Sequence, residues 1–156
     1  MYREGRSPLM HVLEAKLAPH GFKMVAPSDE LTTRGVKKLF HRKTWSANRG
    51  VVLADPGVVA LEDYIARMRH EAGAFLGSSR WNPLGLDVVL VMTDAAVPPL
   101  RALEACVDNL DRHGVAIRSV FALDPSAGRW AAGRTWHFFT GKNQDAIAAA
   151  IEEVVG

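Results

Sequence analysis

Apolar residues in this chain follow two different spacings, and the alternation between them predicts the order of helices and strands. Apolar residues recur three or four positions apart over residues 9–17, 61–76 and 100–110, and again over residues 147–154. This spacing places apolar side chains on one face of an amphipathic helix. The sequence therefore predicts four helices, the first of which begins at Ser7-Pro8, a typical capping pair.

Shorter, nearly continuous apolar runs predict the strands. The runs over residues 51–55, 86–93 and 115–123 are rich in valine and leucine and are bounded by turn residues. The run 86–93 is the strongest, because an almost unbroken apolar segment is typical of a strand that is covered on both faces. Two further strands are predicted over residues 22–26 and 130–140.

The segment before residue 51 is harder to assign. Residues 36–45 fit either a helix or a strand, while residues 46–50 have the composition of a turn. Two strands joined by a turn is the more economical interpretation. Residues 27–30, with the sequence Pro-Ser-Asp-Glu, fit a loop or a short helical turn.

Taken in order, these elements give the pattern αβββαβαββα, which predicts an α/β fold. Residues 86–124 form a strand–helix–strand unit, and such a unit joins two parallel strands through a right-handed crossover. The final strand follows a short loop and is expected to be antiparallel. We therefore expect a single α/β domain over residues 1–156, with a mixed, centrally parallel sheet of five or six strands and helices on its faces.

The composition is that of an ordinary globular protein. The chain has 156 residues, 48% of them hydrophobic and 23% charged, with a net charge of +2. Cys106 is the single cysteine, so no intramolecular disulfide can form, which fits a reducing compartment. Neither a secretory signal nor an apolar run long enough for a membrane span is present in the sequence. We expect a cytoplasmic protein in which any nucleic-acid binding depends on a local patch.

Three aspartates follow apolar runs that predict strands, namely Asp55, Asp94 and Asp124. Ligands of α/β proteins bind at the carboxyl ends of strands, where converging carboxylates can hold Mg²⁺ for phosphoryl transfer. Each aspartate also stands where a turn or a helix cap would favour this residue. Two interpretations of these aspartates therefore stay open, a catalytic role and a simple role in turns.

A basic segment between residues 31 and 54 contains no Asp or Glu. Its basic residues and its tryptophan are Arg34, Lys37, Lys38, His41, Arg42, Lys43, Trp45 and Arg49. Clustered cations with interleaved aromatic rings favour binding of phosphates and unpaired bases. On a strand, Lys38 and Arg42 would share one face, with Lys43 on the opposite face. The alternative is an edge strand whose charges prevent aggregation.

Three tryptophans, Trp45, Trp81 and Trp130, fall near predicted chain reversals. Exposed, they would anchor a partner, whereas buried they would cover the ends of the core. Tryptophan is mostly buried in folded proteins, and we expect burial here.

The segments that resemble metal- or cofactor-binding motifs lack a required residue at the required spacing. His70-Glu71 lacks the second histidine of a zinc helix, because position 74 is Ala74. The segment Thr140-Gly141-Lys142-Asn143 would need a glycine at Trp136 and a Ser or Thr at Asn143 to match a phosphate-binding loop. We therefore expect no cofactor and no structural metal.

The opening order αβββαβ, over roughly residues 8–93, resembles the restriction-endonuclease-like nucleases. That family's motif is an acid followed by Glu-x-Lys on adjacent strands. Here the Glu-x-Lys pattern occurs as Glu14-Ala15-Lys16, within the first predicted helix. The resemblance concerns the fold of the first half and does not imply the nuclease chemistry.

These patterns favour a non-enzymatic interaction module that binds a protein or nucleic-acid partner through the basic, Trp-containing segment, without membrane contact. Homodimer formation is compatible with this interpretation. The alternative is a metal-dependent phosphoryl hydrolase or nuclease with Asp55, Asp94 and Asp124 at the strand ends. Whether the chain is an enzyme stays open at this point.

Overall fold

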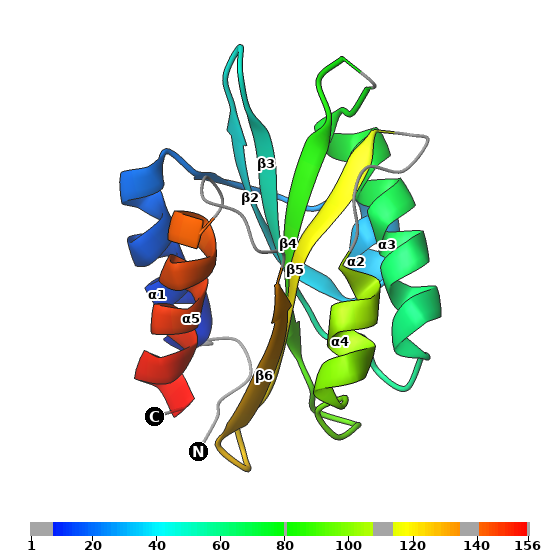
Figure 1. Ribbon diagram of the computed structural model, residues 1–156, viewed down its shortest axis with the longest axis vertical. Coiled ribbons are helices and arrows are strands. Elements are labelled where there is room, and N and C mark those ends of the chain that lie inside the picture. Colours follow the sequence, from blue (N-terminus) through cyan, green and yellow to red (C-terminus); the bar gives the residue numbers. More distant parts are fainter. Residues whose placement is uncertain (1–7, 80, 108–113, 135–140, 156) are drawn as a thin grey trace.

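The computed structural model describes residues 8–79, 81–107, 114–134 and 141–155 (Figure 1). In this part of the chain, six strands form one sheet with helices on both faces. The elements in chain order are α1 (Pro8–Leu17), η1 (Ala18–His20), β1 (Lys23–Val25), α2 (Asp29–Thr33), β2 (Val36–Lys43), β3 (Asn48–Ala54), α3 (Leu61–Leu76), β4 (Leu84–Val91), α4 (Leu100–Cys106), β5 (Val115–Asp124), β6 (Arg129–Arg134) and α5 (Gly141–Val155).

The sheet is mixed, with its strands in the order β1-β2-β3-β4-β5-β6. β1, β2 and β3 are antiparallel neighbours, β3, β4 and β5 run parallel, and β6 is antiparallel to β5. The predicted α/β class, the parallel strands within residues 86–124 and the antiparallel final strand are therefore confirmed.

Two hydrophobic cores lie on opposite faces of the sheet, because successive strand residues point to opposite sides. Phe40, Val51 and Phe121 pack under α1 and α5, whereas Leu39 and Val52 pack on the side of α3 and α4. Every residue of β4 is buried, which explains the nearly unbroken apolar run there. Figure 1 shows this arrangement as three layers, with α1 and α5 on one side and α2, α3 and α4 on the other.

Several boundaries differ from those predicted. β3 begins at Asn48, and a tight turn closes the hairpin through a 2.7 Å hydrogen bond from Thr44 N to Ala47 O. The short helix α2 begins after Ser28, whose hydroxyl accepts a hydrogen bond from Leu31 N at 3.3 Å. α4 ends at Cys106 because the next residue, Val107, takes an extended conformation. The predicted Ser7 cap and residues 108–113 and 135–140 lie outside the described residues.

The structure also bears on two further expectations, which concern edge protection of β2 and membrane-spanning helices. β2 is not an edge strand, because β1 pairs with it over Leu39, Phe40 and His41. His41 is the basic residue of β2 within this paired stretch, whereas Lys37, Lys38, Arg42 and Lys43 lie beyond it, where edge protection stays an explanation. None of the described helices is both long enough and apolar enough to pass through a membrane.

Candidate anion-binding groove

A groove of about 590 Å³ opens where the β2–β3 hairpin and the segment preceding β4 project beyond the helices (Figure 1). It runs along the start of β3, β4 and β5, on the face of the sheet that α1 and α5 cover further down. Residues that line it include Trp45, Asn48, Arg49, Trp81, Gly85 and Arg118. Backbone elements from three separate parts of the sequence thus build one site.

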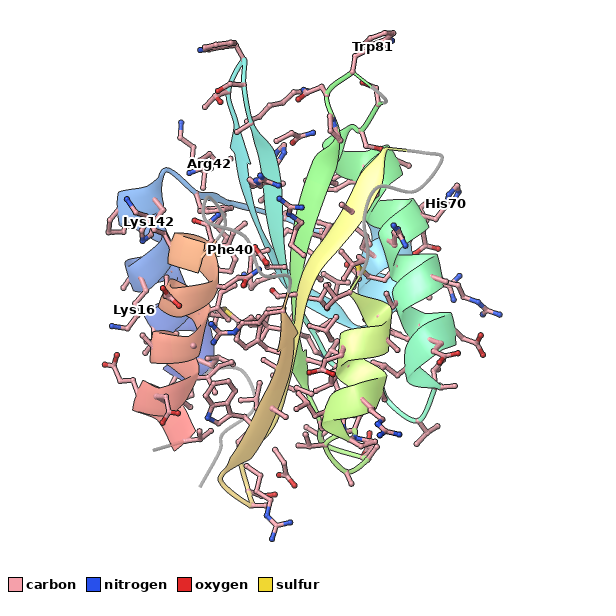
Figure 2. All side chains as sticks on the ribbon, in the orientation of Figure 1. Lys16, Phe40, Arg42, His70, Trp81 and Lys142 are labelled. Carbon is pink, nitrogen blue, oxygen red and sulfur yellow. The ribbon has the colours of Figure 1, made fainter. Side chains whose placement is uncertain are left out.

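Trp45 and Trp81 flank this groove from its two loops and are 98% and 94% exposed. Figure 2 shows Trp81 at the tip of the loop that leads into β4. The expected burial is therefore wrong for both residues. Trp130 is half-buried, since its ring stacks on Phe121 at 6.1 Å and its Nε1 donates to Glu152 at 3.1 Å. The two exposed indoles consequently lack the packing that holds Trp130.

Arg49 and Arg118 line the floor of the groove. The register pairs Arg49 on β3 with Gly85 on β4, and a Cβ atom at position 85 would lie only 2.2 Å from Arg49 Nη1. Glycine at this position therefore leaves the space that the Arg49 guanidinium occupies. Arg118 lies on the same face because Val115 and Ile117 of β5 pack on the α3 side, so alternation places Ala116 and Arg118 on the groove side. A register shift follows in β5, with Leu86 opposite Ile117 but Asp87 opposite Ser119.

Arg42 adds a third cation on the same face of the sheet, because it pairs with Arg49 across the hairpin. Its Nη1 donates to the His20 carbonyl at 3.0 Å, and its guanidinium lies 5.4 Å from the centre of the Phe22 ring. The Arg42 Nε atom is buried and has no hydrogen-bond partner among the described residues. Figure 2 shows Arg42 above α1, towards the hairpin end of the sheet.

A buried carboxyl group, Asp87, lies on β4 on the same side as Gly85, and it is 2% exposed. The Ser119 hydroxyl donates to Asp87 Oδ1 at 2.6 Å. Burial raises the pKa of Asp87 to about 6, and this effect outweighs hydrogen bonding from Ser119 and Gln144 and the charges of Arg49 and Arg118, which all lower it. Burial thus makes the ionised form of Asp87 costly, although its charge attracts both arginines.

The first turn of α5 contacts this cluster, because Gln144 Nε2 donates to the Arg118 carbonyl at 3.1 Å. Burial and the nearby positive charges of Arg118 and Arg42 lower the pKa of Arg49, while Asp87 raises it. Burial is the largest of these effects, and the charges of Arg118 and Arg42 act in the same direction. An anion in the groove would offset the positive charge around Arg49.

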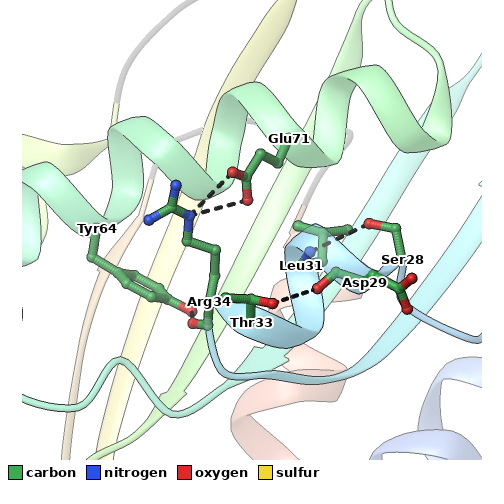
Figure 3. A network of polar contacts seen from close by, with 7 residues as sticks. All are labelled: Ser28, Asp29, Leu31, Thr33, Arg34, Tyr64 and Glu71. Atoms are coloured by element: carbon green, nitrogen blue, oxygen red, sulfur yellow. Dashed lines mark hydrogen bonds and ion pairs between the residues drawn. The ribbon is translucent and has the colours of Figure 1, made fainter.

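Arg34 from the basic segment lies elsewhere, on the α3 side of the sheet (Figure 3). Its Nε donates to both carboxylate oxygens of Glu71, at 3.1 and 3.2 Å. The Tyr64 hydroxyl donates to the Arg34 carbonyl at 2.7 Å. These contacts fasten the end of α2 to α3, so Arg34 has a structural role.

The lysines of the segment are also outside the groove lining. Lys38 pairs with Leu53, towards the opposite end of β2 from Arg42, and Lys37 beside it is exposed. Lys43 is exposed on the α3 side, where its Nζ approaches Gly77.

His41 Nε2 is 2.7 Å from Asn48 Oδ1, and Asn48 Nδ2 donates to the Gly77 carbonyl at 2.7 Å. This chain of contacts fixes the hairpin to the end of α3. The basic residues of this segment therefore lie in different places, and Arg42 and Arg49 lie together on the groove side of the sheet.

Two of the three aspartates at the strand ends accept hydrogen bonds. Asp55 accepts hydrogen bonds from Gly57 N at 3.0 Å and from the Thr93 hydroxyl, and Asp124 accepts from Ser126 and from Ala127 N. Asp94 is exposed. No group of three or more His, Cys, Asp or Glu residues that could hold a metal ion is present in the described residues, which include all three aspartates.

Sequence reasoning missed Asp87, Arg118 and Ser119 altogether. The signal for Asp87 was a lone carboxylate within a run predicted to be covered on both faces. Arg118 had no comparable signal, because the strand pairing that brings it close to Arg49 and Gly85 joins parts of the chain that are far apart in the sequence.

Comparisons of the chain with models of known protein families, with curated proteins and with solved structures give no match. The resemblance to the restriction-endonuclease-like nucleases thus stays one of element order, and Glu14-Ala15-Lys16 lies on α1. The fold and the groove are therefore the basis for any functional proposal.

Proposed function

We propose that this chain is a non-enzymatic binding module that holds an anionic partner in the groove between Trp45 and Trp81. The observation that carries the proposal is the combination of two almost fully exposed indoles with arginines beneath them. Exposed aromatic anchors and arginine are the residue types most enriched at binding surfaces.

The magnitudes favour a binding role. A tryptophan covered by a partner removes about 150–250 Å² from water, worth roughly 4–6 kcal/mol at ~25 cal/mol/Å² before the costs of association. Charge-assisted hydrogen bonds contribute about 1.5–3 kcal/mol each. Two indoles and two guanidiniums therefore supply enough interaction energy for a specific complex, even after those costs are subtracted.

The rival function, a metal-dependent hydrolase at the strand ends, has less support. The local hydrogen bonds of Asp55 and Asp124 account for these residues as turn residues. The groove lies at the opposite end of the parallel strands, where β4 begins. The binding interpretation is thus the one that the side-chain geometry favours.

The cellular setting forms part of the same proposal. We place the module in the cytoplasm, where Cys106 would remain a thiol. Homodimer formation is a separate prediction, which sedimentation of the full chain would test.

A direct test uses inorganic polyphosphate as the anion and compares two double variants with equal net charge. Arg49→Gln with Arg118→Gln removes the cations of the groove floor, and we expect affinity to fall by at least roughly 100-fold, as for two lost charge-assisted hydrogen bonds. Lys37→Gln with Lys38→Gln removes the same charge away from the groove and should change affinity by less than about threefold. Isothermal titration calorimetry measures both.

Circular dichroism on each variant separates loss of binding from loss of folding. Equal losses in the two double variants would contradict the proposal, because affinity would then follow net charge alone. So would failure of the folded wild-type chain to bind polyphosphate at low salt.

A further inference from the structure

We infer that the partner of this groove is single-stranded nucleic acid, with bases stacked on Trp45 and Trp81 and the backbone phosphates on Arg49 and Arg118. The inference rests on the proposed function and adds the chemical class of the partner to it.

The indoles are the first argument. An anion without rings, such as a phosphate chain, would need the arginines alone, and it would leave both indoles in water. Trp45 and Trp81 come from different loops, both line the same groove, and are 98% and 94% exposed. Two flat apolar faces beside a line of cations match a ligand that alternates rings with negative charges.

The cations are the second argument. The groove floor has guanidinium groups, from Arg49 and Arg118, while the lysines of the basic segment lie elsewhere. A guanidinium is planar, binds phosphate through two parallel N–H groups and stacks on rings, whereas an ammonium group acts as a point charge. The Arg49 side chain lies over Gly85, and Asp87 and Ser119 form the next residue pair along β4 and β5 on the same face.

Whether the nucleic acid is single- or double-stranded follows from which base faces an indole can reach. In a duplex the bases are stacked inside and present only their edges, so an indole cannot stack on them without unpairing the strands. In a single strand the base faces are free. A volume of about 590 Å³ is within the range of small-ligand sites, so the groove would hold a short stretch of the strand at a time.

An acidic peptide is the other class of anionic macromolecule that could reach the groove. Its carboxylates could bind the arginines, but it offers no series of ring faces to the two exposed indoles. Charge and ring complementarity together favour the nucleic acid, and the peptide becomes an outcome of the test.

The test measures binding of a fluorescein-labelled oligothymidylate of about 12 nucleotides, within the ~4–16 nucleotides that single-strand-binding folds occupy. Fluorescence anisotropy gives the affinity for wild type, Trp45→Ala, Trp81→Ala and, as a matched control, Phe75→Ala. Phe75 is an exposed aromatic residue on α3, across the sheet from the groove.

We expect each tryptophan variant to lose roughly 5- to 150-fold in oligonucleotide affinity, the range of base-stacking contributions. Trp45→Phe should recover part of this loss, because phenylalanine keeps a stacking face. The Phe75 variant should bind like wild type. Polyphosphate affinity should be unchanged in all these variants, because that probe has no rings.

Several outcomes would overturn the inference and leave the proposed function intact. These are oligothymidylate binding that is insensitive to both tryptophan substitutions, tighter binding of a duplex of the same length, and tighter, tryptophan-dependent binding of polyglutamate. If the wild-type chain bound neither polyphosphate nor the oligonucleotide, the proposed function itself would fail.

Discussion

At residue 87 the chain places a carboxyl group inside a strand whose other residues are apolar or glycine. The Asp87 carboxyl is 2% exposed and accepts a hydrogen bond from Ser119. Burial of an ionised group is costly unless partners replace the lost water. Since burial has the largest effect on the pKa of Asp87, the partners replace that water only in part.

This leads to a prediction about pH and stability. The folded chain holds a proton on Asp87 up to a pKa of about 6, while the unfolded chain releases it near the ordinary aspartate pKa of 3.8. The stabilising contribution of the protonated group is therefore complete below the unfolded value and is lost as pH rises through the folded value. We expect a loss of roughly 3 kcal/mol between pH ~4 and ~7, at about 1.4 kcal/mol per unit.

The variant Asp87→Asn isolates this effect, because asparagine cannot titrate and keeps an oxygen for the Ser119 hydroxyl. Urea unfolding of wild type and variant gives the difference in their free energies of unfolding at each pH, in which other titrating groups cancel. That difference should fall by a few kcal/mol from pH ~4 to ~7. A constant difference over this interval would show that Asp87 does not titrate as its burial implies.

At the scale of elements, strand register decides which arginines meet. Alternation along a strand places Lys38 and Arg42 on the face opposite Lys43, as the sequence predicted, and the hairpin register sets Arg42 beside Arg49. Arg118 joins them because alternation along β5 places it, with Ala116, on the face opposite Val115 and Ile117. The extra residue that β5 carries opposite β4 then keeps Ser119 on the same face as Asp87.

Gly85 on β4 offers a test of this geometry. In Gly85→Ala the new methyl group would meet the far end of the Arg49 side chain, which is flexible and can move. We therefore expect the free energy of unfolding to change by less than about 1 kcal/mol, while polyphosphate affinity falls because the guanidinium is displaced. Thermal unfolding and calorimetric titration measure the two effects.

The matched control is Gly50→Ala on the neighbouring strand β3. A Cβ at Gly50 would lie 2.9 Å from Leu86 Cδ2 and 3.1 Å from Leu76 Cδ1, in the core on the opposite face of the sheet. That substitution should lower stability and leave anion affinity unchanged. The reverse pattern in the two variants would mean that the Arg49 guanidinium does not bind the anion.

Element order was predictable from the sequence because hydrophobic spacing reflects which faces of an element are covered. The apolar run of β4 and the stripe of α3 are the plainest cases. Other features depend on tertiary contacts. The exposure of Trp45 and Trp81 reflects how far two loops project from the sheet, and the meeting of Arg118 with Arg49 reflects the pairing of β3, β4 and β5. Residue types alone carry neither kind of information.

For the molecule as a whole, the two proposed functions require opposite ends of the sheet. The groove lies where β4 begins, at Leu84, whereas Asp55, Asp94 and Asp124 lie at or just beyond the carboxyl ends of β3, β4 and β5. At about 3.3 Å per residue, the eight residues of β4 separate these ends by roughly 20 Å. The position of a bound ligand along the strands therefore distinguishes the two functions, even when the natural partner is not known.

Amide chemical shifts of the full-length chain would make this distinction. Addition of oligothymidylate should shift the signals of residues 42–49, 81–87 and 116–119 most, because these segments carry the groove. Residues 55–57, 93–95 and 124–127 should shift little, since they lie beyond the length of a strand from the ligand. Addition of Mg²⁺ alone provides the comparison, because a hydrolase of the rival kind would bind the ion at the three aspartates. Saturable Mg²⁺ shifts confined to that second set, without oligonucleotide shifts in the first set, would favour the enzyme over the binding module. An ion that gathers three carboxylates from separate strand ends marks a charged site that the turn contacts of these aspartates do not explain.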